Sequence, residues 1–322
     1  MNTTQTKTII WFLSFSSIFC LLAYLYRILP MQSSGAYILI PSLVVILGLW
    51  YYKKDDEEFH LAMMVGFWGG VLGVLGYDLM RLPLHFLGLN PLTPIRSYGM
   101  FILNDPHSSF TSDMAGFWYH FSNGITFAWI YSLIALKKNR WWAVAWAIVL
   151  ELLAYGTVFG EVYALRSNMT AFSIGLGAHF FYGYPLGWLA EKPKERLQSL
   201  LSWKKKKGII SMVFAMTILL LFFGLAWEPL HKGHNKNQTV QLGPDAQYHG
   251  WTEVDINEHF LITNETGKTL LFDIPGLRDK SKIDSNEEVM VLFPKPGIYQ
   301  IRTFGTGWRS SFVAVEERGF LR

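Results

Sequence analysis

Among the ionisable residues within or at the ends of long apolar runs, where charged side chains are costly, five lie at a similar depth. They are Asp78, Asp113, His120, Glu161 and His179. A charge inside a membrane span costs at least about 2.5–3.5 kcal/mol, so such residues usually face the bundle interior and have a function. Two histidines and a carboxylate can hold a divalent metal such as zinc or iron, which acidifies bound water. We therefore assign His120, His179 and Asp78 as candidate metal ligands, and Asp113 and Glu161 as candidate catalytic carboxylates.

The same residue types also support a non-enzymatic interpretation. Carboxylates and histidines on membrane helices are typical of proton relays and solute-binding sites. Glu151, near the middle of its apolar run, is either an inward extension of such a site or a carboxyl hydrogen-bonded within the core. A structural hydrogen-bond network, with Asp78 paired to Arg81, is a further alternative. The candidates lie on different segments without a diagnostic spacing, so the sequence leaves the choice between enzyme and binding or transport protein open.

Helical spacing gathers polar and small residues on one face of the segment that carries His120. Asp113, Gly116, His120, Asn123 and Gly124 recur at intervals of three and four residues or their sums, which is typical of one helix face. His179 has glycines four residues to either side. These patterns predict an open, polar site in the outer half of a helical bundle.

Seven apolar runs could position these residues. A membrane span needs about 20 predominantly apolar residues. The runs cover residues 8–29, 36–52, 60–80, 114–136, 141–163, 170–190 and 208–227. A signal peptide is the alternative for the first run, although it lacks a convincing cleavage site. Gly66/Gly70 and Gly69/Gly73 form Gly-x-x-x-Gly pairs in the third run, which predict tight helix packing there.

Lysine and arginine residues set the expected orientation. They gather between the second and third, fourth and fifth, and sixth and seventh runs, and such loops are usually cytoplasmic. We therefore expect an integral plasma or inner membrane protein with a cytoplasmic N-terminus and an extracytoplasmic C-terminal domain. Its expected partners are membrane lipids and an amphipathic substrate or protein at the outer face. The long apolar connection over residues 81–113 would form a rim or lid there.

After residue 230 the sequence changes to short strand-like runs separated by turn residues. This pattern predicts an all-β sandwich over residues 231–322. The transmembrane domain is expected to cover residues 1–230. The expected strands cover residues 238–242, 251–254, 259–263, 269–273, 288–293, 297–303 and 311–316. The glycosylation sequons at Asn168, Asn237 and Asn264 fall on the expected outer side.

The last third of this β domain resembles the closing strands of cupredoxins. The resemblance rests on Glu288–Phe293, on the Pro-Gly-x-Tyr corner at Pro296–Tyr299, and on Phe312–Val315. Copper-binding cupredoxins carry a Cys, a His and a Met between the last two strands, and residues 303–311 contain none of them. The resemblance therefore implies a cupredoxin-like sandwich without blue copper. An immunoglobulin-like sandwich is the alternative.

Composition limits the remaining functional classes. Charged residues make up 16% of the chain, below the roughly 25% of soluble domains, and the net charge is only +4. The basic residues form no stripe for nucleic acid. Cys20 is the one cysteine, which excludes an internal disulfide or a cysteine-based zinc site. The sequence does not identify which divalent metal would bind.

Two hypotheses remain. One is a membrane-embedded hydrolase or oxidase acting on an amphipathic substrate. The other is a solute, ion or proton binding or transport protein with an extracytoplasmic docking domain.

Overall fold

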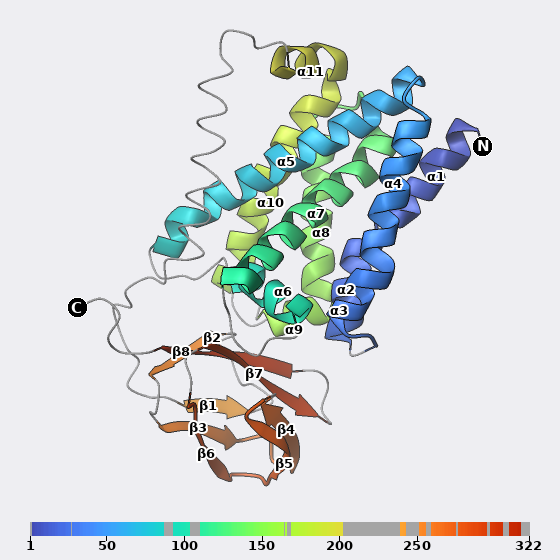
Figure 1. Cartoon of the computed structure of the whole chain (residues 1–322). Coiled ribbons are helices and arrows are strands. Elements are labelled where there is room, and N and C mark those ends of the chain that lie inside the picture. Colours follow the sequence, from blue (N-terminus) through green and yellow to red (C-terminus); the bar gives the residue numbers. More distant parts are fainter. Residues whose placement is uncertain are drawn as a thin grey trace. The chain divides into compact units, whose positions relative to one another are not determined.

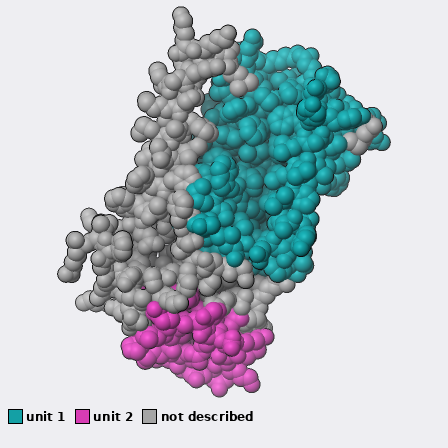
Figure 2. Space-filling view, viewed as in Figure 1, with its two compact units in different colours: residues 1–103, 110–153, 173–229 teal, residues 104–109, 154–172, 230–322 magenta. Residues whose placement is uncertain are grey.

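The computed structural model divides the chain into two compact units, shown in separate colours in Figure 2. The helical unit comprises residues 1–103, 110–153 and 173–229, and the second unit comprises residues 104–109, 154–172 and 230–322. The described residues are 2–26, 28–86, 93–103, 110–163, 165, 169–201, 239–242, 251–255, 259–274, 276–294, 297–304 and 309–316.

Helices make up most of the chain before residue 202 (Figure 1). In chain order they are α1 (Thr3–Leu13), α2 (Ser16–Leu25), α3 (Met31–Ser34), the π-helical turn η1 (Gly35–Leu39), α4 (Ile40–Tyr52), α5 (Glu57–Phe86), α6 (Thr93–Leu103), α7 (Phe110–Ala135), α8 (Trp141–Gly156), α9 (Val158–Val162), α10 (Met169–Glu191) and α11 (Pro193–Leu201).

Within the described part of the chain, three helical stretches are long and apolar enough to cross a membrane. They are Thr3–Leu25, Met31–Tyr52 and Glu57–Leu84, and they coincide with the first three predicted runs. The fourth and sixth runs fall on α7 and α10, whose serine, histidine and glycine residues lower their mean hydropathy. The fifth run is divided between α8, which has 16 residues, and α9. The seventh run lies outside the described residues, so seven spans stay a prediction.

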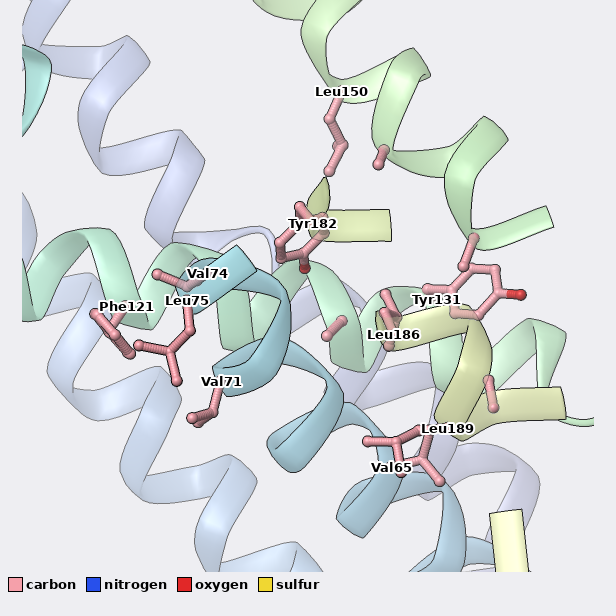
Figure 3. Packing of buried hydrophobic residues seen from close by; sticks show 14 of the residues in the cluster. Val65, Val71, Val74, Leu75, Phe121, Tyr131, Leu150, Tyr182, Leu186 and Leu189 are labelled. Carbon is pink, nitrogen blue, oxygen red and sulfur yellow. The ribbon is translucent and has the colours of Figure 1, made fainter. Parts of the chain in front are cut away.

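Helix α5 packs closely against both α7 and α10, as its glycines predict (Figure 1). A Cβ added to Gly70 would lie 2.6 Å from the Cα of Ile125 on α7. One added to Gly73 would lie 2.7 Å from the ring of Tyr182 on α10. The two Gly-x-x-x-Gly pairs thus serve two different neighbours: Gly66/Gly70 face α7, and Gly69/Gly73 face α10. Between these contacts the apolar core includes Val74, Leu75, Phe121 and Leu186 (Figure 3).

Helix α6 lies within the long connection that follows α5, and it packs against the first half of α7. A Cβ added to Gly99 would overlap the carbonyl oxygen of Ser112, and one added to Gly116 would overlap that of Ile95. The two backbones therefore touch directly. A role of this connection as a rim or lid stays a prediction.

An ion cluster joins the end of α10 to α8 and α11. Glu191 accepts hydrogen bonds from the guanidinium groups of Arg140 and Arg196, both at 2.8 Å. These bonds hold the pKa of Glu191 at about 2, well below its ordinary value of 4.5. Because the folded-state pKa is lowered, the pair stabilises the fold above about pH 4.5, and this contribution is lost as the pH falls toward 2.

Glu191→Gln should therefore lower the thermal stability of the detergent-solubilised protein near neutral pH, and the difference from wild type should shrink in acid. Unfolding temperatures of both proteins at about pH 7 and about pH 3 measure this dependence. A difference of equal size at both pH values would contradict it.

The second unit contains two sheets that contribute to one apolar core. The three-stranded sheet has the order β1-β3-β6, and the five-stranded sheet has the order β2-β8-β7-β4-β5. Most core side chains alternate along their strands, with Phe260 and Ile262 on β3 and Phe272 and Ile274 on β4 as examples. The strands are β1 (Thr239–Leu242), β2 (Trp251–Asp255), β3 (His259–Asn264), β4 (Leu270–Ile274), β5 (Arg278–Ile283), β6 (Glu288–Leu292), β7 (Gly297–Phe304) and β8 (Arg309–Glu316).

Strand β5 was not predicted, whereas the seven predicted strands correspond to the other seven. Its residues Arg278–Ile283 include Asp279, Lys280 and Lys282, and only Ile283 is fully buried. Among the described strands, β5 forms one edge of its sheet and pairs with β4 alone. Charged residues are common on edge strands because they discourage pairing with other chains. The apolar alternation by which strands are recognised is therefore absent.

Asn264 is fully buried at the end of β3, although it belongs to a glycosylation sequon. Its side-chain nitrogen donates to the carbonyl oxygens of Lys268, Ile283 and Asp284 at 2.7, 2.9 and 3.1 Å. Its side-chain oxygen accepts from the backbone and hydroxyl groups of Thr266. A glycan on this nitrogen is incompatible with the fold, so the sequon at Asn264 is not a modification site of the folded unit. Asn168 and Asn237 lie outside the described residues.

Candidate functional site

Three residues of α5 place ionisable and aromatic groups inside the helical unit. Tyr77, Asp78 and Arg81 follow the glycines that bring α5 against its neighbours. The Asp78 side chain is fully buried, and that of Arg81 is 5% exposed. The third predicted apolar run ends at residue 80, two residues after Asp78. Helix α5 continues through Pro83 to Phe86, so Asp78 lies eight residues, or about 12 Å, from its end.

The first buried pair joins α5 to α7. Nε2 of His120 lies 3.1 Å from each carboxylate oxygen of Asp78. The guanidinium group of Arg81 lies 3.5 Å from one of the same oxygens. Asp78 is therefore closer to the imidazole than to the guanidinium. Arg81 has five N–H donors, and most of them do not contact Asp78.

The second buried pair joins α8 to α10. Nδ1 of His179 lies 3.1 Å from Oε2 of Glu151 and 2.9 Å from the carbonyl oxygen of Gly175, one turn earlier on α10. A carbonyl oxygen only accepts hydrogen bonds, so Nδ1 carries a proton and Nε2 is the nitrogen available for a second one. Among the described residues, Oε1 of Glu151 has no hydrogen-bond partner.

The ring of Tyr77 lies between the two pairs. Its centroid is 5.7 Å from that of His120 and 5.0 Å from that of His179, with the second contact edge-to-face. The guanidinium carbon of Arg81 lies 4.7 Å from the same centroid, within the range of a cation–π contact. Four helices thus supply one contiguous group of six residues: Tyr77, Asp78, Arg81, His120, Glu151 and His179.

The structure brings together some of the predicted site residues and separates others. His120 and Asp78 are in contact, whereas His179 is paired with Glu151 rather than with Asp78. Across the described residues, no group of three or more His, Cys, Asp or Glu side chains has an arrangement that could hold a metal ion. The predicted metal set of His120, His179 and Asp78 therefore stays a prediction.

One of the two predicted catalytic carboxylates, Asp113, lies apart from this group along α7. Asp113 lies in the first turn of α7, seven residues or about 10 Å along the helix from His120. Glu161 lies on α9, and its side chain is outside the described residues. Tyr77 and Arg81 were not assigned to a site, although the Asp78–Arg81 pair was considered as a structural contact, and that contact is present.

Helical depth was the signal that could have found the Glu151–His179 pair. Counted from the expected outer ends of their runs, Glu151 lies twelve residues in and His179 nine. At about 1.5 Å per residue, these positions are about 18 Å and about 13 Å below the same surface. Depths this similar on antiparallel helices allow two long side chains to meet.

No family model and no curated protein matches the chain. A solved structure of a mutant of amicyanin in its Cu(I) form matches 26% of this chain and 87% of its own length, at 11% identity and a TM-score of 0.22. This weak similarity identifies no family for the chain.

Proposed function

We propose that this chain is a multi-pass membrane protein that takes up protons at two buried histidine–carboxylate pairs and uses them to bind or conduct a solute. The observation that carries the proposal is that each buried carboxylate, Asp78 and Glu151, contacts an imidazole at 3.1 Å. The proposed β-sandwich, cupredoxin-like and without copper, serves as an extracytoplasmic docking domain.

Paired groups of this kind are suited to proton binding. Histidine changes its charge near physiological pH, and a nearby carboxylate accepts or shares the same proton. In an apolar bundle an uncompensated charge is costly. A proton that binds to one of the pairs changes the charge of that pair, and therefore changes which neighbouring groups it attracts. Tyr77 contacts both imidazoles, so a change in either pair reaches the other through one ring.

The alternative is the membrane-embedded hydrolase or oxidase with a divalent metal. A catalytic zinc site typically needs three protein ligands on one ion. Asp78 and Glu151 are each engaged by a different histidine, which supports proton chemistry over a shared metal. Metal analysis of the purified protein separates the two functions, because a stoichiometric metal that is lost in both His120→Ala and His179→Ala would favour the enzyme.

The proton proposal predicts a titration that requires no knowledge of the solute. Infrared difference spectra between about pH 5 and about pH 8 should contain a carboxyl signal from the buried pairs. Asp78→Asn should remove the part that arises from the first pair, and Glu151→Gln the part from the second. Both amides keep the shape of the side chain but cannot ionise.

Asp113→Asn is the matched control, since it changes a carboxylate of α7 two turns away from His120. Its spectrum should keep the signals of both pairs. A wild-type spectrum in which neither Asp78 nor Glu151 contributes between these pH values would contradict the proposed function.

A further inference from the structure

One corner of the helical unit gathers cationic side chains beside exposed aromatic rings. It is formed by the turn from α7 to α8, residues 136–140, and by the end of α10. The two segments are in backbone contact. The N–H of Lys137 donates to the carbonyl oxygen of Ala190 at 2.8 Å, and a Cβ added to Gly187 would overlap the carbonyl oxygen of Arg140.

Cations outnumber carboxylates at this corner. Arg140 and Arg196 both donate to the same oxygen of Glu191, so one carboxylate offsets only one of the two guanidinium charges. Lys137 and Lys138 are exposed, and none of the ion pairs formed by the described residues includes either of them. We call Lys137, Lys138, Arg140, Glu191 and Arg196 the basic corner. Its four cations and one carboxylate give it a net charge of +3 at neutral pH.

The basic corner lies at the end of the helical unit where apolar helical stretches begin. Glu57, the first residue of the stretch Glu57–Leu84, pairs with Lys194 on α11. The hydroxyl group of Thr3, the first residue of the stretch Thr3–Leu25, donates to Asp56 at 2.5 Å. In the proposed membrane protein, the basic corner is therefore level with the lipid headgroups of one leaflet.

An exposed aromatic surface extends from the basic corner along α8 and α10. The ring of Trp141 lies 6.1 Å from that of Tyr184 and 6.3 Å from that of Phe180, and the last two rings are stacked at 6.2 Å. Trp141 is 56% exposed and the other two are each 38% exposed. A guanidinium nitrogen of Arg140 donates to the hydroxyl group of Tyr184 at 3.2 Å, so the cations and the aromatic surface are continuous.

The length of this surface suits a lipid. Tyr184 and Phe180 lie seven and eleven residues before Glu191 on α10, which corresponds to about 10 Å and about 16 Å along the helix. Tryptophan and tyrosine side chains are common where headgroups meet acyl chains. The upper end of the surface therefore meets the headgroup level, and its lower end meets the acyl chains.

We infer that the basic corner binds the phosphate of an anionic phospholipid, whose acyl chains lie along Trp141, Tyr184 and Phe180. Guanidinium and ammonium groups are the usual partners of phosphate in proteins. Each lysine or arginine near an anionic membrane surface strengthens the attraction about fivefold. A zwitterionic phospholipid gains less from the excess of cations because its headgroup carries its own ammonium group. The inference rests on the proposed membrane location and is independent of the proposed proton function.

Native mass spectrometry of the detergent-solubilised protein tests the inference. The protein is titrated with phosphatidylglycerol and, separately, with phosphatidylcholine of the same acyl chains. The Kd of the first bound phosphatidylglycerol should be at least about tenfold lower than that of the first phosphatidylcholine. Higher salt should reduce this preference, because exposed charges are screened. Glycerol phosphate at the same concentration should not displace the lipid, since it lacks the chains that contact the aromatic surface.

Two double variants locate the headgroup. Lys137→Gln with Lys138→Gln should raise the Kd for phosphatidylglycerol about tenfold or more and change that for phosphatidylcholine little. The matched control is Lys53→Gln with Lys54→Gln, because these two consecutive lysines belong to the same end of the unit but precede Asp55 and Asp56. The control should keep the preference for phosphatidylglycerol.

A third variant tests the aromatic surface. Trp141→Ala should raise the Kd for both lipids by a similar factor, because it removes contact with the chains and keeps the cations. Its unfolding temperature should stay close to that of wild type, since Trp141 is exposed.

The outcomes separate this inference from the proposed function. Equal Kd values for the two lipids, or equal effects of the two lysine double variants, would overturn it. Displacement of the lipid by glycerol phosphate would assign the basic corner to a soluble phosphate compound and would also overturn it. None of these results affects the carboxyl signals of Asp78 and Glu151, on which the proton function depends. Recovery of the chain in soluble form without detergent would reject the membrane location that both proposals share.

Discussion

Gly175→Ala should remove the infrared signal of the Glu151–His179 pair while the helical unit stays folded. A methyl group at this position would overlap Oε1 of Glu151 and lie 2.7 Å from its carboxyl carbon. The carboxylate must therefore move, and its 3.1 Å contact with Nδ1 of His179 is lost. Alanine favours a helix over glycine by about 1 kcal/mol, so α10 itself is not weakened. Difference spectra between about pH 5 and about pH 8 measure the effect.

Gly177→Ala provides the matched control on the same helix. Its added methyl group would meet the terminal methyl of Met80 at 2.9 Å, and a flexible methionine side chain can move aside. The signal of the pair should therefore persist in this variant. If both alanine variants behave like wild type, the position of the Glu151 carboxylate does not control the titration.

Asn264→Ala should destabilise the β unit by about 3–5 kcal/mol, a large part of the stability of a small domain. The substitution removes three donated hydrogen bonds, to Lys268, Ile283 and Asp284, and leaves buried acceptors unpaired. Asn264→Asp should be similarly harmful, since a carboxylate offers no donor to these carbonyl oxygens. Hydrogen exchange of the full chain should show a loss of protection in β3–β6 of about a hundredfold or more.

The control for this prediction is Asn286→Gly, in the turn between β5 and β6. Asn286 is exposed and has a φ of 61°, a conformation that glycine adopts without strain. Protection of the same strands should change little. A loss in Asn286→Gly equal to that in Asn264→Ala would mean that the turn, rather than the buried amide, limits the stability.

The segments of the helical unit were more predictable than their ends. Apolar run length located the first three helical stretches, because burial or membrane insertion demands continuous apolar sequence. The end of α5 was misplaced because Arg81 and Pro83 resemble a boundary, although the helix continues to Phe86. Charged strand β5 was missed because its residues carry no apolar alternation.

The partners within the site were less predictable. Position along a helix gives depth, but contact also depends on how each helix is rotated about its axis. Depth alone allowed His179 to meet Asp78 or Glu151, and packing of α8 against α10 selects Glu151. A close approach at Gly183, where an added Cβ would lie 2.7 Å from the backbone of α8 at Val144, sets that rotation. Such detail requires both helices at once and is not encoded in either segment alone.

The glycine faces of α5 have a mechanical consequence. Its glycines lie directly against Trp129 on α7 and against Leu186 and Tyr182 on α10, so α5 is held tightly between its two neighbours. Tyr77, Asp78 and Arg81 are carried on this one rod. Any displacement of α5 therefore alters two contacts at once: that of Asp78 with His120 and that of Tyr77 with His179. The two histidine–carboxylate pairs are thus mechanically coupled through one helix.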